Sequence, residues 1–218
     1  SLVRQLLGED ALRNDSVVHA HGTGTPQNRV TESHVLNEVA KAFHISDWPV
    51  AAIKAYVGHS LGSAGGDQLA SAAGTFQDGL LPGIATVDHF AADLHDSNLS
   101  FSCEHREMRP SAALLNSKGF GGNNATAVML SPDATLDLLR RRHGQSTLDS
   151  WRDRVADTRE AAADYERRAL AGETAPDYYF NDGVLSGDDL SITDQSIRLP
   201  GWDQALTFRD DPGFDDYR

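Results

Sequence analysis

Short apolar runs alternate with longer helical patterns over the first 130 residues of the chain. The runs typical of buried strands lie at Val17–Val18, Ala51–Gly58, Leu99–Ser102, Ala112–Leu115 and Ala125–Leu130. The segments with apolar residues at helical spacing lie at Ser1–Arg13, Thr31–Phe43 and Gly62–Leu80. Alternating strands and helices predict an α/β fold built on a mixed sheet.

Local signals suggest where these elements begin and end. Thr31 suits the N-cap of the helix expected over Thr31–Phe43, because its hydroxyl can accept a hydrogen bond from a free backbone N–H. Gly79 and Pro82 bracket the exit of the glycine-rich helix that precedes them. Ile84–Val87 is expected to be a short extended piece, and a turn is expected at Met108–Pro110.

The pattern changes after Pro132, which predicts two regions, 1–132 and 133–218. The second region begins with two charged helices, Asp133–His143 and Leu148–Leu170, of which the later one has a narrow apolar stripe. Ala175–Arg218 is rich in aspartate but also in aromatic and aliphatic residues, which disordered tails usually lack. We therefore expect a C-terminal extension that wraps the surface of its own protein; a flexible acidic tail is the alternative.

Composition narrows the classes of partner. The formal net charge of −13 argues against nucleic acid or an anionic membrane surface. No apolar run is long enough to span a bilayer. The single cysteine, Cys103, excludes an intrachain disulfide and suits a reducing cytoplasm.

Chemically useful residues gather at three junctions where an expected strand meets a glycine-rich turn. They read V-H-A-H-G-T-G-T-P up to Pro26, A-A-I-K-A-Y-V-G-H-S up to Ser60, and N-S-K-G-F-G-G-N-N up to Asn124. The ends of strands are where α/β folds usually carry their chemistry. Any one junction could be a satisfied histidine or an ordinary turn, but three in this order favour a functional site.

Together the three motifs resemble those of the β-ketoacyl synthases, the decarboxylating condensing enzymes of fatty acid and polyketide synthesis. The matching patterns are H-G-T-G-T-P followed by Glu32, K-x-x-x-G-H-S-x-G-x-A-G, and N-S-x-G-F-G-G-x-N. The resemblance covers roughly Ser1 to Pro132. It implies a thiolase-like fold, of which this chain supplies the C-terminal half, a homodimer, and no metal or other cofactor.

The resemblance also implies roles for four catalytic residues. His21 and His59 would act as neutral imidazoles that donate hydrogen bonds to a thioester oxyanion, and the expected helix N-terminus beside His59 favours its neutral form. Lys54 would order the two histidines. The Phe120 N–H would contribute to a second oxyanion hole, together with the N–H of a cysteine that this chain lacks.

Further positions follow from the same resemblance. Thr23 and Thr25 would bind the amides of a phosphopantetheine arm, although a threonine-rich tight turn is the alternative. Gly121 and Gly122 would let the backbone approach the acyl group. The two supporting residues are Glu32, which is otherwise a simple first-turn glutamate, and Asn124.

The family's nucleophilic cysteine is missing from its usual setting. Cys103 lies in L-S-F-S-C-E-H-R-E, an alternating segment that is expected to be an edge or hairpin strand and lacks a small-residue elbow. A structural thiol is the better interpretation. The chain also starts without an initiator Met, so we expect the nucleophile on an N-terminal half outside this sequence and no activity from this chain alone.

One position departs from the family pattern. Lys118 stands two residues before Phe120, where many elongating members carry an aromatic gate to the acyl pocket. A cation there suits a short acyl group or a coenzyme A phosphate. The thioester partner is therefore expected to be acyl carrier protein or coenzyme A. A non-catalytic, chain-length-factor-like subunit is the alternative function, and a degradative thiolase-type enzyme is a third.

Overall fold

The computed structural model describes residues 2–175 and 183–208. By their contacts the residues divide into two compact units, Ser1–Arg154 and Val155–Arg218. The first unit contains all three motifs. Each unit is described separately below.

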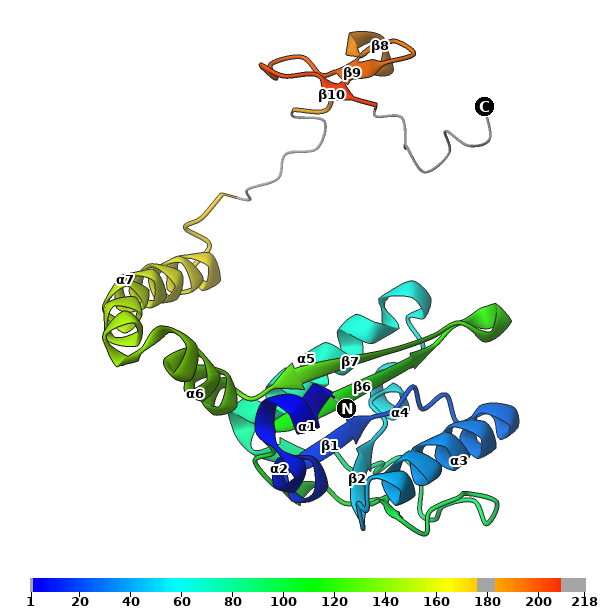
Figure 1. Cartoon of the computed structure of the whole chain (residues 1–218). Helices are drawn as coiled ribbons and strands as arrows, with labels where there is room; N and C mark the ends of the chain where they lie inside the picture. Colours follow the sequence, from blue (N-terminus) through cyan, green and yellow to red (C-terminus); the bar gives the residue numbers. More distant parts are fainter. Residues whose placement is uncertain (1, 176–182, 209–218) are drawn as a thin grey trace, which may run out of the picture. The chain divides into compact units, whose positions relative to one another are not determined.

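A five-stranded sheet in the order β4-β2-β1-β6-β7 forms the centre of the first unit (Figure 1). Its strands are β1 (Ser16–His19), β2 (Trp48–Ala51), β4 (Leu99–Ser100), β6 (Ala112–Lys118) and β7 (Asn124–Leu130). β4, β2, β1 and β6 run parallel, and β7 pairs antiparallel with β6. The predicted mixed α/β fold is confirmed.

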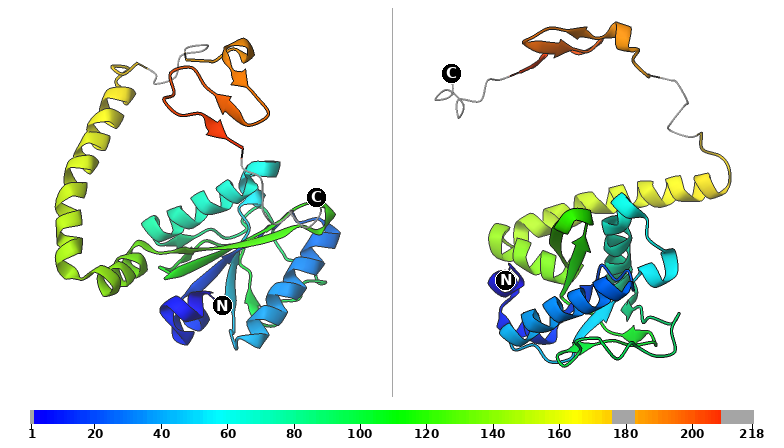
Figure 2. Two further views of the ribbon diagram at one scale, coloured as in Figure 1. Left: turned by 45° about the horizontal axis from the view of Figure 1, so that its top comes forward. Right: turned by 90° about the vertical axis from the view of Figure 1, so that its right-hand side faces the viewer.

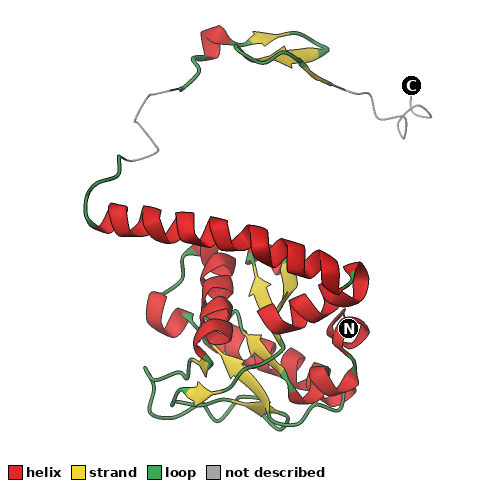
Figure 3. Cartoon of the chain, turned by 90° about the vertical axis from the view of Figure 1, so that its left-hand side faces the viewer, coloured by secondary structure: helices red, strands yellow, loops and turns green. Residues whose placement is uncertain are grey.

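Helices are the other major component of this unit, as the colouring in Figure 3 shows. They are α1 (Leu2–Leu7), α2 (Glu9–Asn14), α3 (Pro26–Ala42), α4 (Lys54–Val57), α5 (Ala64–Asp78), α6 (Pro132–His143) and the start of α7 (Gln145–Leu170). Two 3-10 turns, Leu61–Ser63 and Phe120–Gly122, and a small pair of strands, β3 (Leu80–Leu81) and β5 (Arg106–Glu107), complete it. Within the described residues no helix is long and apolar enough to cross a membrane.

The sheet separates two cores because successive side chains of a strand point to opposite faces. Val18 and Ala20 belong to the cluster that packs with α3, whereas Val17 packs with Ala72 and Phe76 of α5. Figures 1 and 2 show α3 and α5 on opposite sides of the sheet. The shared parallel direction then brings the carboxyl ends of β1, β2 and β6 to one edge, where the three motifs begin.

The expected strand over Ala51–Gly58 is wrong beyond its first residue. β2 ends at Ala51, and Lys54 opens the short helix α4. Gly58 ends this helix with a φ of 71°, in the left-handed region that glycine favours. The apolar residues after Lys54 therefore belong to one helical turn, and an apolar run this short does not by itself distinguish a helical turn from a strand.

The helix expected from Thr31 begins earlier. α3 starts at Pro26, and its N-cap is Thr25. Proline is favoured in the first helical turn, since its fixed φ suits a helix and its missing N–H would be unpaired there. Pro26 therefore begins the helix, five residues before the predicted start at Thr31.

Three smaller predictions also need correction. The N-terminal helix is divided into α1 and α2 at Gly8, whose φ is 97°. Ile84–Val87 forms no strand. Cys103 lies in a bend between β4 and β5 and is half-buried, so the strand expected around it is wrong.

The second unit contains the rest of α7 and a three-stranded antiparallel sheet. Its strands are β8 (Ser191–Ile192), β9 (Ser196–Arg198) and β10 (Leu206–Thr207), in the order β10-β9-β8. The long charged helix is confirmed, with bounds Gln145–Leu170. The prediction that Ala175–Arg218 wraps the protein partly concerns residues 176–182 and 209–218, which lie outside the described residues. It stays a prediction, as does the region boundary at 132/133.

Candidate active site

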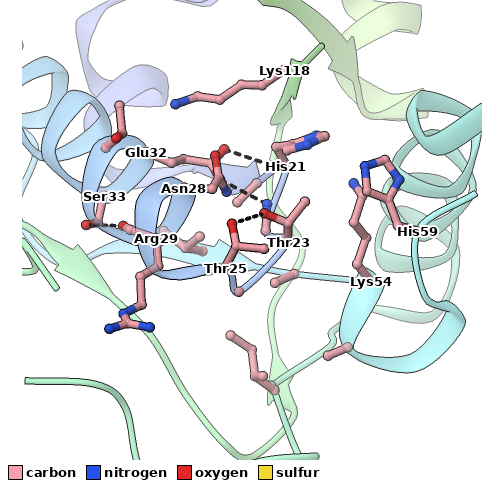
Figure 4. A pocket seen from close by; sticks show the side chains of 18 of the residues that line it. His21, Thr23, Thr25, Asn28, Arg29, Glu32, Ser33, Lys54, His59 and Lys118 are labelled. Atoms are coloured by element: carbon pink, nitrogen blue, oxygen red, sulfur yellow. Dashed lines mark hydrogen bonds between the residues drawn. The ribbon is translucent and has the colours of Figure 1, made fainter. Parts of the chain in front are cut away.

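Two histidines from different motifs meet at the carboxyl edge of the sheet. The ring centroids of His21 and His59 are 5.2 Å apart, and their planes are at 80°. His21 follows β1, whereas His59 follows α4 and precedes α5. Both line the same cleft, together with Lys54 (Figure 4). The structure therefore brings together three residues that the sequence motifs singled out.

His21 is held in place through its own backbone. The Glu32 carboxylate, on α3, accepts hydrogen bonds from the His21 N–H at 2.8 Å and from the Gly22 N–H at 2.9 Å. The side-chain amides of Asn28 and Asn116 donate to the same carboxylate at 3.0 and 2.6 Å. Glu32 therefore anchors the turn after β1 to α3 and β6, which is more than the simple first-turn glutamate that was the alternative.

Electrostatics favour a neutral His21. Burial lowers the pKa of the His21 imidazole below its usual value, and the positive charge of Lys54 lowers it further. Glu32 acts in the opposite direction on this pKa but with less effect. A neutral imidazole retains one N–H donor, which is the form that an oxyanion-binding role requires.

A backbone hydrogen bond indicates which nitrogen of His59 carries its proton. The Leu61 N–H donates to His59 Nδ1 at 3.1 Å, so the neutral ring has its proton on Nε2. Leu61 makes this hydrogen bond with a φ of 57°, in the left-handed region that is unusual for a residue other than glycine. The Ser60 hydroxyl bonds to Asp67 on α5 and fastens the same turn.

Lys54 is a buried cation. Only 8% of the residue is exposed, and its Nζ has no hydrogen-bond partner among residues 2–175 and 183–208. Burial lowers the pKa of Lys54, while Glu32 and Asp67 oppose this effect. In Figure 4 its amino group points toward the two imidazoles.

The cleft around these residues is open and large, about 1890 Å³, which exceeds the usual range of closed small-molecule pockets. Thr23 and Thr25 line it, and their hydroxyls are 3.3 Å apart. The irregular segment 84–94 also lines the cleft. The two threonine hydroxyls thus lie beside a cleft that is large enough for an extended ligand.

The Phe120 loop borders the same cleft. Phe120, Gly121 and Gly122 all line it, and the two glycines have φ values of 76° and 84°. Phe120 is 91% exposed. Asn124 also lines the cleft, but its amide donates to the Gly122 carbonyl and so supports the loop.

Lys118 completes the set of predicted residues. It lines the cleft, and in Figure 4 its extended side chain leads away from the two imidazoles. Its charge adds slightly to the lowering of the His21 pKa. Among the described residues no three His, Cys, Asp or Glu side chains form a group that could hold a metal ion.

Comparison with known proteins now identifies the family. Residues 4–88 match the family model described as the β-ketoacyl synthase C-terminal domain. The chain is also 46% identical over 216 residues to the β-ketoacyl-(acyl carrier protein) synthase FabY of Pseudomonas aeruginosa. This chain belongs to the β-ketoacyl synthases.

The match to FabY extends through the C-terminal extension of this β-ketoacyl synthase chain. It covers 97% of the chain, whereas the match to the Escherichia coli 3-oxoacyl-(acyl carrier protein) synthase 1, at 31% identity, covers 51%. The crystal structure of the ketosynthase FabY covers the whole chain with a TM-score of 0.79 and 44% identity. The thiolase-like fold is therefore confirmed. The chain spans 34% of the length of FabY and 26% of the Escherichia coli synthase.

Several residues of the site did not stand out from the sequence. Asn28 and Asn116 contact Glu32, and Gln68 bonds to backbone carbonyls beneath the site. Asn116 was visible as the first letter of a motif, but Asn28 and Gln68 are ordinary polar residues on helices. His19, next to the motif, is buried, and neither of its ring nitrogens has a hydrogen-bond partner in the part of the chain that the structure describes; burial lowers its pKa to about 4.

Proposed function

We propose that this chain is the C-terminal part of a β-ketoacyl-(acyl carrier protein) synthase that performs a decarboxylative Claisen condensation in fatty acid or polyketide synthesis. The observation that carries the proposal is the pair of imidazoles, 5.2 Å apart, that face one cleft beside the buried Lys54. A non-catalytic partner subunit has no need to retain this arrangement. The close likeness to FabY, which is described as such a synthase, supports the same activity.

The first chemical step uses the two imidazoles. A malonyl thioester places its thioester oxygen between His21 and His59, and its carboxylate leaves as carbon dioxide. The electron pair of the broken C–C bond moves into an enolate, whose oxygen then accepts the hydrogen bonds. Donors of this kind contribute roughly 2.7–4 kcal/mol each to the transition state.

Protonation states suit this step. His59 has its proton on Nε2 because Nδ1 accepts from Leu61, and burial together with Lys54 keeps His21 neutral. Lys54 thus acts on the histidines through its charge and its position. Because hydrogen bonds hold the His21 backbone and the His59 ring before the substrate binds, little reorganisation is needed as charge develops.

The second step joins the carbanion to an acyl group held on a cysteine. Attack on the acyl carbonyl creates a new oxyanion, which the Phe120 N–H would stabilise, and the cysteine thiolate then leaves. We place this cysteine outside the 218 residues, since Cys103 lies in a bend between β4 and β5. This chain alone would therefore be inactive. The complete synthase would be a cytoplasmic homodimer. Its other parts would cover apolar residues that are exposed in this chain, such as Phe120, Leu61 and Leu69.

The donor is a pantetheine thioester, carried by acyl carrier protein or coenzyme A. The paired hydroxyls of Thr23 and Thr25 suit its amides, and the glycines after Phe120 leave room for the acyl group. Lys118 in place of an aromatic gate favours a short acyl primer over a long one. A C-terminal extension packed on the synthase would narrow access to the acyl site, which also favours a short acyl primer.

The test is a condensation assay of the complete synthase with malonyl-(acyl carrier protein) and with acetyl or long-chain primers. The proposal expects a β-ketoacyl product, formed faster from acetyl primers, and no product from the 218-residue chain alone. A complete synthase that binds malonyl thioesters but forms no product would contradict the activity. Preference for long primers would contradict only the substrate class.

A further inference from the structure

Gln68, on α5, lies beneath the candidate active site and is fully buried. Its Nε2 lies 3.0, 2.7 and 2.8 Å from the carbonyl oxygens of His19, Ala20 and Asn116. Its Oε1 accepts a hydrogen bond from the Ser117 hydroxyl at 2.7 Å. Three carbonyls around the nitrogen and a hydroxyl at the oxygen fix which way the amide points.

These carbonyls lie where two neighbouring strands separate. The pairing of β1 with β6 ends at His19 and Leu115, after which β6 continues with β7 alone as far as Lys118. Ala20 and Asn116 are the next residues of the two strands. Backbone carbonyls at such a fork lose their sheet partners, and a buried carbonyl without a partner is costly. The Gln68 amide fills the fork.

The contacts of Gln68 connect all three motifs. Ala20 directly precedes His21, and Ser117 is three residues before Phe120. Gln68 itself lies on the helix that follows His59. Its side chain hydrogen-bonds backbone carbonyls at both the β1 end and the β6 end. The Gln68 amide therefore connects the segments that hold both imidazoles and the Phe120 loop.

A second set of contacts closes this network. The Asn116 side chain donates to Glu32, which in turn accepts from the His21 N–H. The β6 end is thus tied to the turn that holds His21 both through Gln68 and through Glu32. Loss of Gln68 would leave the Glu32 contacts intact but let the strand ends move apart beneath the rings.

We propose that Gln68 is a positioning residue for the decarboxylation step, which sets His21 against His59 and the Phe120 loop. The inference rests on the proposed function. Gln68 touches neither substrate nor reacting atoms, and acts through the strand ends. Misplacement of catalytic groups by about 1 Å can cost on the order of 100-fold in rate. The cost should fall on kcat, because Thr23 and Thr25, which line the channel for the thioester arm, receive no contact from Gln68.

The test compares Gln68→Met with Thr75→Val in the complete synthase. Methionine keeps the length of the side chain but cannot donate to the carbonyls. Thr75 is a matched control, since it is also buried on α5 and its hydroxyl bonds only to the Ser71 carbonyl of the same helix. Malonyl decarboxylation is measured per folded active site, with kcat and KM determined separately.

We expect Gln68→Met to lower kcat on the order of 100-fold with KM unchanged, and Thr75→Val to keep the wild-type kcat. If Gln68→Met does not fold, Ser117→Ala removes only the bond that orients the amide and should lower kcat several-fold. Wild-type kcat in the variant that folds would overturn the inference, as would an equal loss in Thr75→Val. A wild type without decarboxylation would instead overturn the proposed function, and this inference with it.

Discussion

Replacement of Glu32 by glutamine should destabilise the first unit strongly, although the two side chains have almost the same shape. Glu32 is 4% exposed. Each of its carboxylate oxygens accepts two hydrogen bonds, Oε1 from the His21 N–H and Asn116, and Oε2 from the Gly22 N–H and Asn28. Whichever way the glutamine amide turns, its NH₂ group faces two donors.

The magnitude follows from that count. Hydrogen bonds to a charged group contribute about 1.5–3 kcal/mol each, so the loss of two predicts a decrease of about 3–6 kcal/mol in the free energy of unfolding. Asn116 or Asn28 can rotate its amide, which places the result toward the lower end. The His21 N–H or the Gly22 N–H cannot rotate in this way and remains buried without an acceptor.

Glu38→Gln on the same helix is the control. Its carboxylate is about half exposed and lies 3.8 Å from Lys41, so the change should stay within about 0.5 kcal/mol. Urea unfolding of each variant, followed by tryptophan fluorescence, to which the buried Trp48 contributes, gives the two free energies. Equal values for Glu32→Gln and Glu38→Gln would refute the assignment of Glu32 as the anchor of the His21 turn.

Three other changes have clear expected outcomes. Gly22→Ala places a Cβ 2.8 Å from the Ala52 Cβ at a φ of 56°, whereas a Cβ at Gly24, where φ is 69°, has no described atom within 4 Å. Gly22→Ala should therefore lower the free energy of unfolding by about 1–3 kcal/mol more than Gly24→Ala. Equal free energies of unfolding for the two variants would contradict this. Burial lowers the pKa of His19 from 6.5 to about 4 in the folded chain. As pH falls, the His19 imidazole therefore becomes protonated in the unfolded chain at a higher pH than in the folded chain. The free energy of unfolding should therefore decrease by about 3 kcal/mol between pH 6.5 and 4, and His19→Leu should lack this decrease in urea titrations. Cys103→Ser should leave condensation by the complete synthase unchanged, whereas an acyl-enzyme found on Cys103 by mass spectrometry would disprove the proposed location of the nucleophile.

The sequence predicted the general architecture well, because strong periodic patterns and strand-end motifs reflect burial directly. One example is the apolar run at Val17–Val18, which lies in the buried strand β1. Another is the glycine-rich segment that was predicted to begin a helix and lies at the start of α5. Short segments were less certain. The turn of α4 around Lys54 has the same apolar spacing as a strand, and only the tertiary structure distinguishes them.

The candidate site was predicted in its principal residues and missed in its supports. His21, His59 and Lys54 were visible because they belong to glycine-containing motifs that resemble those of a known family. Gln68 and Asn28 gave no such signal, since a polar residue on a helix is usually solvated. The role of Gln68 depends on the strand ends that lie against α5, and the role of Asn28 depends on the position of the Glu32 carboxylate. Both are properties of the folded chain.

The central claim is that His21 and His59 together stabilise the oxyanion of decarboxylation. The most direct measurement is release of carbon dioxide from malonyl-(acyl carrier protein) by the complete synthase and by its His21→Ala and His59→Ala variants, with malonyl binding measured in parallel. We expect each variant to bind the malonyl thioester but to lose decarboxylation on the order of 100-fold to 1000-fold. Substantial decarboxylation retained by both variants would contradict the account.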